Sequence, residues 1–371
     1  NRRQSTLQHH PAVGISSVNV LLSCLTLLKP PSLSFSQRIR FGLLLSTKRH
    51  LNDSSKTLHT GLCWRVAVSS WKVTKVLGQV TIQDNGRTGF AHLGITESGA
   101  ADKWAMRCAN ALVGNGESEP VLEITLGGFA FTSECDVSLA VTGARAPLFL
   151  NELPVDQYQT IELKKGDRFE IKPASQGARL YLSVAGGFDT ERLFGSASTC
   201  IREGLGSALS VGDVLTLSEP SIIDPVTLSA DQIPQFKHSI RLGLVKGLQS
   251  HLYDWQAFDR FFQTRFEVSP LSDRMGCRLM TDTPIKPPIG GIRSEGINLG
   301  AVQIPADGQP IIMLNDHQTI GGYMKIGSIC RADLALMAQA TPGTEVHFYP
   351  ISVEHAQQRL RHQLKRVPKV V

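Results

Sequence analysis

Residues 294–323, SEGINLGAVQIPADGQPIIMLNDHQTIGGY, predict a β-hairpin that ends in a cluster of polar side chains. Val302-Gln303-Ile304 alternates apolar and polar residues, Asp307-Gly308 is a strong turn signal, and residues 310–314 are typical of a short buried strand. Gly321-Gly322 then permits a turn without a β-carbon penalty. A rigid sheet would present the polar residues in between as a small site: Asn315, Asp316, His317, Gln318 and Thr319. A loop whose Asx and Thr side chains bind only their own backbone has equal support.

Short strands bounded by Gly, Pro or Asp turns fill most of the preceding chain. Their density favours a closed or nearly closed barrel over residues 73–219, with strands at 80–83, 121–125, 129–131, 137–141, 159–163, 168–171, 180–184 and 214–217. Residues 220–238, rich in Pro, Asp and Ser, predict a linker to a second unit at 239–352, which a basic tail at 353–371 follows. A turn-then-strand phrase recurs before Phe169, Leu215 and Val346, which favours related designs for both units.

Three local patterns carry further expectations. Asn85-Gly86 predicts a type I′ hairpin that places Asp84 opposite Arg87, as an ion pair or as a substrate contact. Ser98 is expected to cap a helix that ends at Gly114 and packs a face of small residues on a sheet. A second helix aligns Leu252, Trp255, Phe258 and Phe262, and this stripe is expected in the core.

The composition of the 371 residues excludes several classes of protein. Residues 1–72 hold 10 Lys and Arg against one acidic residue, which leaves 28 bases and 31 acids for the remainder despite the net charge of +6. A nucleic-acid role therefore has little support. The seven cysteines show no CxxC or Cys/His ligand spacing, so the sequence predicts no disulfide framework, no metal site and a cytoplasmic location.

Residues 1–72 differ from the rest and resemble a transit peptide or a disordered extension outside the barrels. The apolar run at 18–28 is about half of what a membrane-spanning helix needs, so no membrane segment is expected. Because the barrel pattern starts near Val73, the sequence predicts that residues 1–72 are dispensable for stability.

Several phrases of the chain resemble one protein family. These are VTIQDNGRTGF, GITESGAADKWAMRCANALVGN, LEITLGG, YLSVAGGFD, SPLSDRMGCRL and NDHQTIGGYMKIG. They are similar to the allophanate hydrolase subunit 2 family, which includes the C subunit of 5-oxoprolinase and the biotin-dependent carboxyltransferase domain of urea carboxylase. The resemblance runs from about residue 73 to 352 and departs at Met324, where the family usually has Pro. It implies a mainly β fold with a few helices, in two cyclophilin-like β-barrel units.

The resemblance also implies a function shared with other subunits. The favoured activity is ATP-dependent hydrolysis of 5-oxoproline to L-glutamate, with ATP and Mg²⁺ bound in an assembly. The expected partners are a smaller subunit of related fold, a further catalytic subunit and a small amide or lactam substrate. The alternatives are a biotin-dependent carboxyltransferase, with biotin on a partner, and a regulatory antagonist of a kinase-inhibitor protein. No GxxxxGK[ST] loop and no GxSxG elbow occur, so a nucleotide would bind without a Walker A motif.

Both enzymatic activities place negative charge on a carbonyl oxygen, which fixed hydrogen-bond donors stabilise. Arg274 and Arg278 are expected to bind anionic groups, and the alternative is structural ion pairs with Asp273 and Glu295. The residues expected to act in catalysis are Asp316, Arg274 and Gln318. Those expected to bind substrate are Asp84, Arg87, Arg278, Ser294, Glu295, Gln303, Thr319 and Tyr323.

Overall fold

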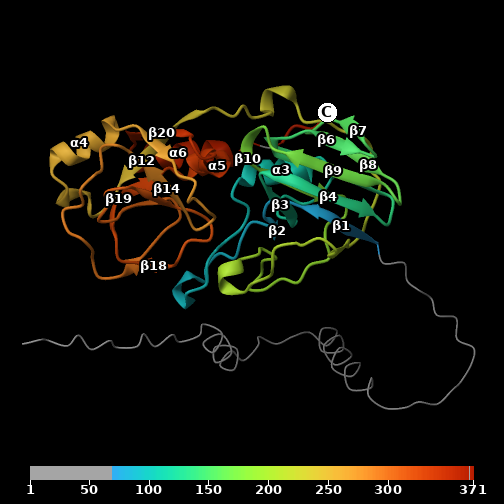
Figure 1. Cartoon of the computed structure of the whole chain (residues 1–371), viewed down its shortest axis with the longest axis horizontal. Coiled ribbons are helices and arrows are strands. Elements are labelled where there is room, and N and C mark those ends of the chain that lie inside the picture. The colour runs from blue at the N-terminus through green and yellow to red at the C-terminus, as the bar shows by residue number, and fades with distance from the viewer. Residues whose placement is uncertain (1–68, 367) are drawn as a thin grey trace, which may run out of the picture. The chain divides into compact units, whose positions relative to one another are not determined.

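The computed structural model describes residues 69–366 and 368–371 (Figure 1). The expectations for residues 1–68, including a targeting or disordered extension, lie outside the described residues. The described chain starts almost at once with strand β1 (Ser70–Val76), so the boundary expected after residue 72 falls inside a strand. Trp71 of that strand is fully buried and stacks on Phe131, with ring centroids 4.0 Å apart. Removing residues 1–72 would therefore remove a core side chain, which corrects the expectation that all of them are dispensable.

Two antiparallel sheets enclose the first core. One has six strands in the order β11-β1-β4-β9-β6-β7, formed by β1, β4 (Gly127–Ser133), β6 (Leu148–Leu150), β7 (Leu153–Val155), β9 (Arg168–Pro173) and β11 (Val214–Thr216). The other has the order β2-β3-β10-β5-β8, formed by β2 (Val80–Gln83), β3 (Val121–Thr125), β5 (Val137–Arg145), β8 (Thr160–Leu163) and β10 (Gln176–Val184). Apolar side chains from both sheets meet in one cluster that includes Phe129, Leu139 and Leu180. This unit is barrel-like, but its two sheets do not close into one hydrogen-bonded ring.

Helix α3 (Lys103–Ala111) packs on the five-stranded sheet. The expected face is correct, since Ala105, Cys108, Ala109 and Leu112 are buried. The expected cap is wrong, because Asp102 accepts the hydrogen bond from the Ala105 amide. Ser98 instead adopts a left-handed conformation, with φ of 56°, and its side chain points to distant partners. Asp is as good a helix cap as Ser, so the sequence offered both.

The turn expected at Asn85-Gly86 is also different. Strand β2 pairs with β3 rather than with a strand after Gly86, and Asn85 lacks the positive φ that a type I′ turn requires. Asp84 and Arg87 therefore do not face each other across a hairpin. Two consecutive non-glycine residues with positive φ, Asn151 and Glu152, connect β6 to β7 in a two-residue hairpin.

The second unit is a closed barrel of seven strands in the order β12-β19-β16-β17-β14-β13-β20. Its strands are β12 (Ser239–Lys246), β13 (Phe266–Val268), β14 (Gly276–Met280), β16 (Ala301–Ile304), β17 (Ile311–Met313), β19 (Met324–Ile329) and β20 (Glu345–Pro350). The hairpin predicted around Asp307-Gly308 is present, with Val302 opposite Ile312. The predicted class, mainly β with two barrel units and few helices, is confirmed.

The strand around Gln303 is buried on both faces rather than alternating. Val302 and Ile304 point into the barrel core, whereas Gln303 is only 1% exposed. A short ribbon of β15 (Glu295–Gly296) and β18 (Ile320–Gly321) lies nearby. Gly321 and Gly322 have no positive φ, and close packing requires Gly321, because a β-carbon there would come 2.4 Å from Ile297 Cδ1.

Helix α4 (Trp255–Gln263) corrects the expected aromatic stripe. Phe261 is its fully buried residue, whereas Trp255 is 75% exposed and Leu252 is 45% exposed. Phe258 and Phe262 are only partly buried against the barrel core. The helix presents a neighbouring face to the barrel because Phe261 fits between Phe266 and Phe348, with ring centroids 5.3 and 4.7 Å away.

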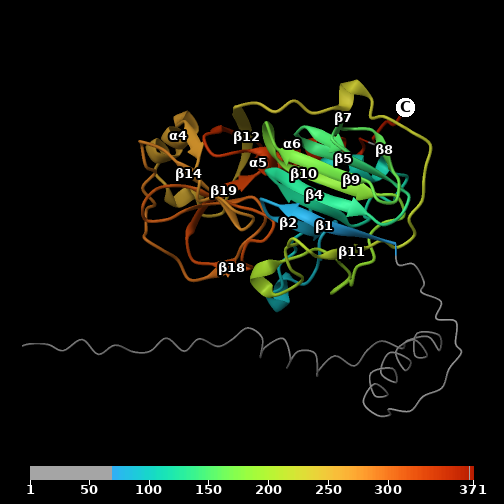
Figure 2. The same ribbon diagram turned by 45° about the vertical axis from the view of Figure 1, so that its right-hand side comes forward.

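Two helices lie between the units in both ribbon views (Figures 1 and 2). The short 3-10 turn η5 (Arg331–Asp333) leads into α5 (Leu334–Gln339), which packs on β10 of the first unit. Helix α6 (Val353–Leu364) follows β20 and is held by Arg359, which pairs with Asp333. The last residues then return to the linker, where the Ser229 amide donates to the Lys369 carbonyl at 2.9 Å.

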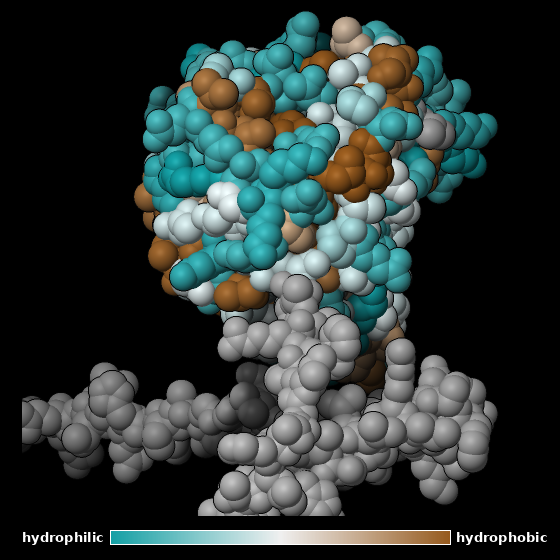
Figure 3. All heavy atoms as spheres, turned by 90° about the vertical axis from the view of Figure 1, so that its right-hand side faces the viewer, coloured by the Kyte–Doolittle hydropathy of each residue, from teal (hydrophilic) through white to brown (hydrophobic). Residues whose placement is uncertain are grey.

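The surface of the first unit carries only small separate apolar groups on the face that Figure 3 shows. In the described part of the chain, every helix is too short or too polar to cross a membrane.

Candidate functional site

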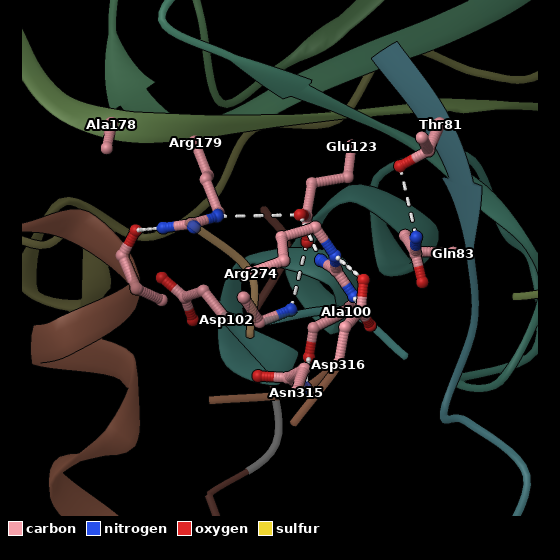
Figure 4. A network of polar contacts seen from close by, with 12 residues as sticks. Thr81, Gln83, Ala100, Asp102, Glu123, Ala178, Arg179, Arg274, Asn315 and Asp316 are labelled. Atoms are coloured by element: carbon pink, nitrogen blue, oxygen red, sulfur yellow. Dashed lines mark hydrogen bonds and ion pairs between the residues drawn. The ribbon is translucent and has the colours of Figure 1, made fainter. Parts of the chain in front are cut away.

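Arg274 forms the centre of a buried ion network between the two units (Figure 4). It lies between β13 and β14 and is 7% exposed. Its Nε donates to Asp316 Oδ2 at 2.9 Å and its Nη2 to Asp316 Oδ1 at 3.0 Å, which is a bidentate pair. Its Nη1 donates to Glu123 of β3, and Nη2 also donates to the Gly99 carbonyl at 2.8 Å. One guanidinium therefore ties the second barrel to the first.

Burial and ion pairing oppose each other in this network. Burial alone lowers the pKa of Arg274, but the carboxylates of Glu123 and Asp316 raise it well above its ordinary value. Burial raises the pKa of Glu123, but Arg274 and Arg179 outweigh it and lower the pKa. Both groups are consequently charged at neutral pH.

The loop before α3 completes the shell around Asp316. Ser98 Oγ donates to Asp316 Oδ1 at 2.7 Å. The Asn315 side-chain amide lies 3.3 Å from each of three consecutive carbonyls, those of Ser98, Gly99 and Ala100. The unusual φ of Ser98 turns these carbonyls toward Asn315 and Arg274. Asp316 is thus fully engaged by protein donors.

A second polar cluster extends the junction toward α5. Gln339 Nε2 donates to Asp102 Oδ2 at 3.0 Å, and Gln339 Oε1 accepts from the Ala178 and Arg179 amides. Tyr181 Oη donates to Glu123 Oε2 at 2.9 Å, which links this cluster to Arg274. Burial raises the pKa of Asp102, although Gln339 opposes the shift.

A small cavity of about 150 Å³ lies beside Arg274 and Asp316. Two hydroxyl groups, two guanidinium groups and two carboxylates line it, together with an amide and apolar walls. The lining residues are Gln79, Thr81, Thr199, Ile201, Arg202, Asp273, Arg274, Met275 and Asp316. The cavity is large enough for a small polar molecule and offers both donors and acceptors, so we define it as the candidate site.

Arg87 lies close to this cavity and is 2% exposed. Its Nη2 donates to the Ser198 carbonyl, next to Thr199, whereas Nε and Nη1 have no acceptor among the described residues. Burial lowers the pKa of Arg87, and the acids around it oppose the shift only at a distance. Asp84 lies within ion-pair distance of Arg192 rather than Arg87, with Arg192 Nη1 3.7 Å from Asp84 Oδ2, and the Ser196 and Ser198 hydroxyls donate to Asp84 Oδ1 at 2.6 and 2.5 Å.

The other expected site residues lie apart from Arg274. Arg278 pairs with Asp307 at 3.0 Å on the surface, so the two arginines do not share an anion. The ion-pair partners expected for them, Asp273 and Glu295, are also wrong, since Glu295 pairs with Lys325 at 2.6 Å.

The remaining expected residues surround the ribbon of β15 and β18. The amide nitrogens of Gln303 and Gln318 would lie 3.2 and 3.5 Å from a β-carbon on Gly321, so these two side chains converge. The Thr319 carbonyl accepts from the Ile297 amide, while Ser294 and Tyr323 are exposed. His317 is buried, which lowers its pKa.

Sequence reasoning missed several residues of the site. Glu123 lies 151 positions from Arg274, in a strand whose sequence is typical of ordinary core. Thr81 lies in β2, a strand that the sequence predicts correctly, but its pattern does not mark Thr81 as a site residue. Thr199 and Arg202 belong to a segment with no recognisable motif. A charged residue inside the apolar run VLEIT was the one available signal for Glu123, since buried acids need a partner.

Comparison with known proteins assigns the fold to a family. Residues 93–350 match the model of the carboxyltransferase domain, subdomains A and B. This chain belongs to that carboxyltransferase-domain family. It is 36% identical over 303 residues to the C subunit of 5-oxoprolinase from Escherichia coli (strain K12), covering 79% of this chain and 97% of that protein. The corresponding protein of Haemophilus influenzae is 34% identical, with 76% and 92% covered.

Urea amidolyases are less similar to this chain. Urea amidolyase of Saccharomyces cerevisiae is 29% identical, with 76% of this chain and 17% of that protein covered. The crystal structure of K. lactis urea amidolyase superposes with a TM-score of 0.76 at 27% identity, covering 82% of this chain and 20% of that one. The family resemblance found in the sequence is confirmed.

Proposed function

We propose that this chain is the C subunit of an ATP-dependent 5-oxoprolinase, which opens 5-oxoproline to L-glutamate together with partner subunits. The observation that carries the proposal is the 36% identity to the C subunit of 5-oxoprolinase along 97% of that protein's length. The urea amidolyase relatives are less similar and are matched over 17% of their length. A match along nearly the whole length of one subunit supports the first activity over the second.

The cavity beside Arg274 suits a small lactam that carries a carboxylate. In this proposal the Arg202 guanidinium and the hydroxyls of Thr81 and Thr199 are donors for a carbonyl oxygen on which negative charge develops. Arg202 Nη2 already donates to Thr96 Oγ1 at 2.8 Å and to Glu203 Oε1 at 2.7 Å, so the other nitrogens of Arg202 would be the donors. Arg87 is buried behind this wall beside Thr199 and has two donors without an acceptor among the described residues. In this proposal these donors bind the carboxylate of the substrate. Arg274 and Asp316 already satisfy each other, so in this proposal they hold the cavity wall and position Thr199 through Ser98, whose Oγ lies 2.9 Å from the Thr199 carbonyl.

The expected base, Asp316, has a smaller role than its sequence position suggested. Both of its oxygens accept from Arg274, and one also accepts from Ser98, so a proton would have to displace these bonds. Asp273 also lines the cavity and is engaged mainly by nearby backbone amides. In this proposal Asp273 is the carboxylate that orients the attacking water.

ATP, with Mg²⁺, would supply the phosphoryl group that the lactam oxygen accepts, which would make the lactam carbonyl carbon a better electrophile for water. The described residues hold basic side chains suited to phosphate, outside the small cavity, at a second and larger cavity between the units. Lys103, Arg107 and Arg331 line that cavity. The residues present therefore fit a phosphate-bearing cofactor.

The experiment is reconstitution with the candidate partner subunits from the same source. The full assembly should convert 5-oxoproline to glutamate with stoichiometric ADP release, and this chain alone should not. Arg202→Gln should lower kcat/KM by about tenfold or more, because one charged hydrogen bond is lost. The control is Arg265→Gln, an exposed arginine paired with Glu345 at 2.6 Å on the second barrel. An assembly inactive on 5-oxoproline but active with a biotinylated carrier would overturn the proposal.

The second candidate is biotin-dependent carboxyl transfer, with biotin on a partner. The matching carboxyltransferase model and the urea amidolyase relatives favour it. Avidin separates the two candidates, since it should abolish carboxyl transfer and leave 5-oxoproline hydrolysis unchanged.

A further inference from the structure

A cavity of about 420 Å³ at the junction of the two units combines aromatic, aliphatic and cationic walls. Helix α3, the turn η5 with α5, and helix α6 each contribute to its wall. Cavities of this size at domain junctions commonly hold ligands larger than a single small acid.

Basic side chains dominate the charge of this cavity. Lys103, Arg107 and Arg331 line it, whereas Glu117 is the one acidic lining residue. The Lys103 ammonium is partly desolvated, and burial together with nearby Arg331 lowers its pKa. The electrostatic free energy of such clustered, desolvated cations falls when an anion binds, because its charge offsets their mutual repulsion.

Existing ion pairs around these cations are weak enough to be exchanged. Glu97 lies 3.6 Å from Lys103 Nζ and 3.4 Å from Arg331 Nη2, which is long for both pairs. Lys103 Nζ also donates to the Asn85 carbonyl at 2.7 Å, a bond that the ammonium can keep while its other protons turn to a ligand. Arg107 donates to Glu117 at 2.8 Å, but Glu117 is 60% exposed, and Arg107 Nε has no acceptor among the described residues. Partly exposed pairs contribute little to stability, so a multiply charged ligand can replace them at small cost.

The other walls of the cavity are apolar. Trp104, Leu334 and Leu360 face the same space as the three cations. An inorganic anion would leave these side chains unused, whereas a planar ring attached to phosphates would use both kinds of wall. The chemistry therefore favours a nucleoside phosphate over a simple anion.

The cavity also adjoins the candidate substrate site. Ala100 and Asn315 line it, and the Asn315 amide lies 3.3 Å from the Ala100 carbonyl. The neighbouring residues Gly99 and Asp316 contact Arg274 of the small cavity. One pair of loops thus separates the two spaces.

We propose that this cavity binds a nucleoside triphosphate, with Lys103, Arg107 and Arg331 on the phosphates and Trp104 with the leucines against the base. The inference rests on the proposed function and extends it, because it places nucleotide binding on this chain. The site needs no Walker A loop, since side chains rather than backbone amides hold the phosphates.

The test is calorimetric titration of the purified full chain with ATP, ADP, adenosine and tripolyphosphate. ATP is expected to bind more tightly than adenosine and than tripolyphosphate, because each of these engages one kind of wall. Arg331→Gln and Arg107→Gln should each weaken ATP binding by about tenfold or more. Arg265→Gln, which removes an exposed ion-paired arginine elsewhere, should leave it unchanged.

A filling substitution checks the location independently of charge. Ala335 lines the cavity from α5, and Ala335→Phe should block ATP while the thermal midpoint shows that the chain is folded. Undetectable ATP binding at millimolar concentration, equal binding by the charge variants, or tripolyphosphate binding as tight as ATP would each overturn the inference. The titration needs no turnover, so an active assembly in which this chain does not bind ATP refutes this inference alone. ATP binding by a chain that fails in the reconstituted assembly refutes the proposed function alone.

Discussion

Two buried arginines of this chain have opposite surroundings. Arg274 is 7% exposed and Arg87 is 2% exposed, so both have lost their water. Every nitrogen of the Arg274 guanidinium has a protein acceptor, from Asp316, Glu123 and Gly99. Arg87 keeps Nε and Nη1 without an acceptor in residues 69–366 and 368–371, and the pKa of Arg87 is lowered by burial whereas that of Arg274 is raised.

The difference separates two roles that the same side chain can have. A buried guanidinium that is fully paired holds two parts of a structure together, and its removal leaves uncompensated charge. A guanidinium that is buried and only partly paired lowers stability. Such a residue is retained where it serves binding. The Arg274 network therefore joins the units, whereas under the proposed function Arg87 would supply donors to the substrate.

The largest expected effect is on the joint between the two units, by which we mean the ion network of Arg274, Glu123 and Asp316. Arg274→Ala should lower the free energy of unfolding by about 3–5 kcal/mol, because Glu123 and Asp316 remain buried without their shared cation. Denaturant unfolding measures this, with Arg265→Ala as the exposed control expected to cost less than about 1 kcal/mol. A loss for Arg274→Ala no greater than that of the control would remove the distinction between the arginines.

Arg274→Lys tests the geometry of the joint rather than its charge. The ammonium cannot reproduce the bidentate pair with Asp316 while also reaching Glu123, so a loss of about 1–3 kcal/mol is expected. If Arg274 instead bound an anionic substrate group, as expected from the sequence, the same change would lower activity and spare stability. Unchanged stability in thermal unfolding would restore that first interpretation.

Acidification should weaken the joint through Glu123. Its pKa in the folded chain is lowered from 4.5, so its contribution to stability is fully present above pH 4.5 and is lost as the pH falls through the lower folded value. Stability measured from pH 6 downward should therefore fall less steeply below pH 4.5 in Glu123→Gln than in the unmodified chain. Parallel curves for both proteins would show that Glu123 is not the group that titrates.

The smallest expected change in stability is at Arg87. Arg87→Met replaces a poorly paired buried charge with an apolar side chain of similar length, so the free energy of unfolding should change by less than about 1 kcal/mol. The KM for 5-oxoproline in the reconstituted assembly should rise by about tenfold or more, since a charged contact to the carboxylate is lost. A large fall in stability with KM unchanged would mean that Arg87, like Arg274, is structural.

Local patterns predicted the strands well because the alternation of apolar and polar residues in a strand, and the turn residues at its ends, depend on neighbouring positions in the sequence. β2 (Val80–Gln83) and β3 (Val121–Thr125) have the predicted bounds, and the hairpin around Asp307-Gly308 is present. Errors arose where two signals were equally good, as with Ser98 and Asp102 at the start of α3. They arose also where burial of a helix face depends on the barrel it meets, as with Trp255.

The sequence by itself determined the mainly β class and the family, and it placed Arg274 and Asp316 in one site. The pairing of β14 with β17 brings these two residues together across 42 positions. Only the tertiary structure decided what each charge does. Glu123 reaches Arg274 across 151 residues, and Asp84 binds Ser196 and Ser198 instead of Arg87. These partners are set by how segments distant in the sequence pack against each other, and no periodicity within one segment encodes which buried charge will be compensated.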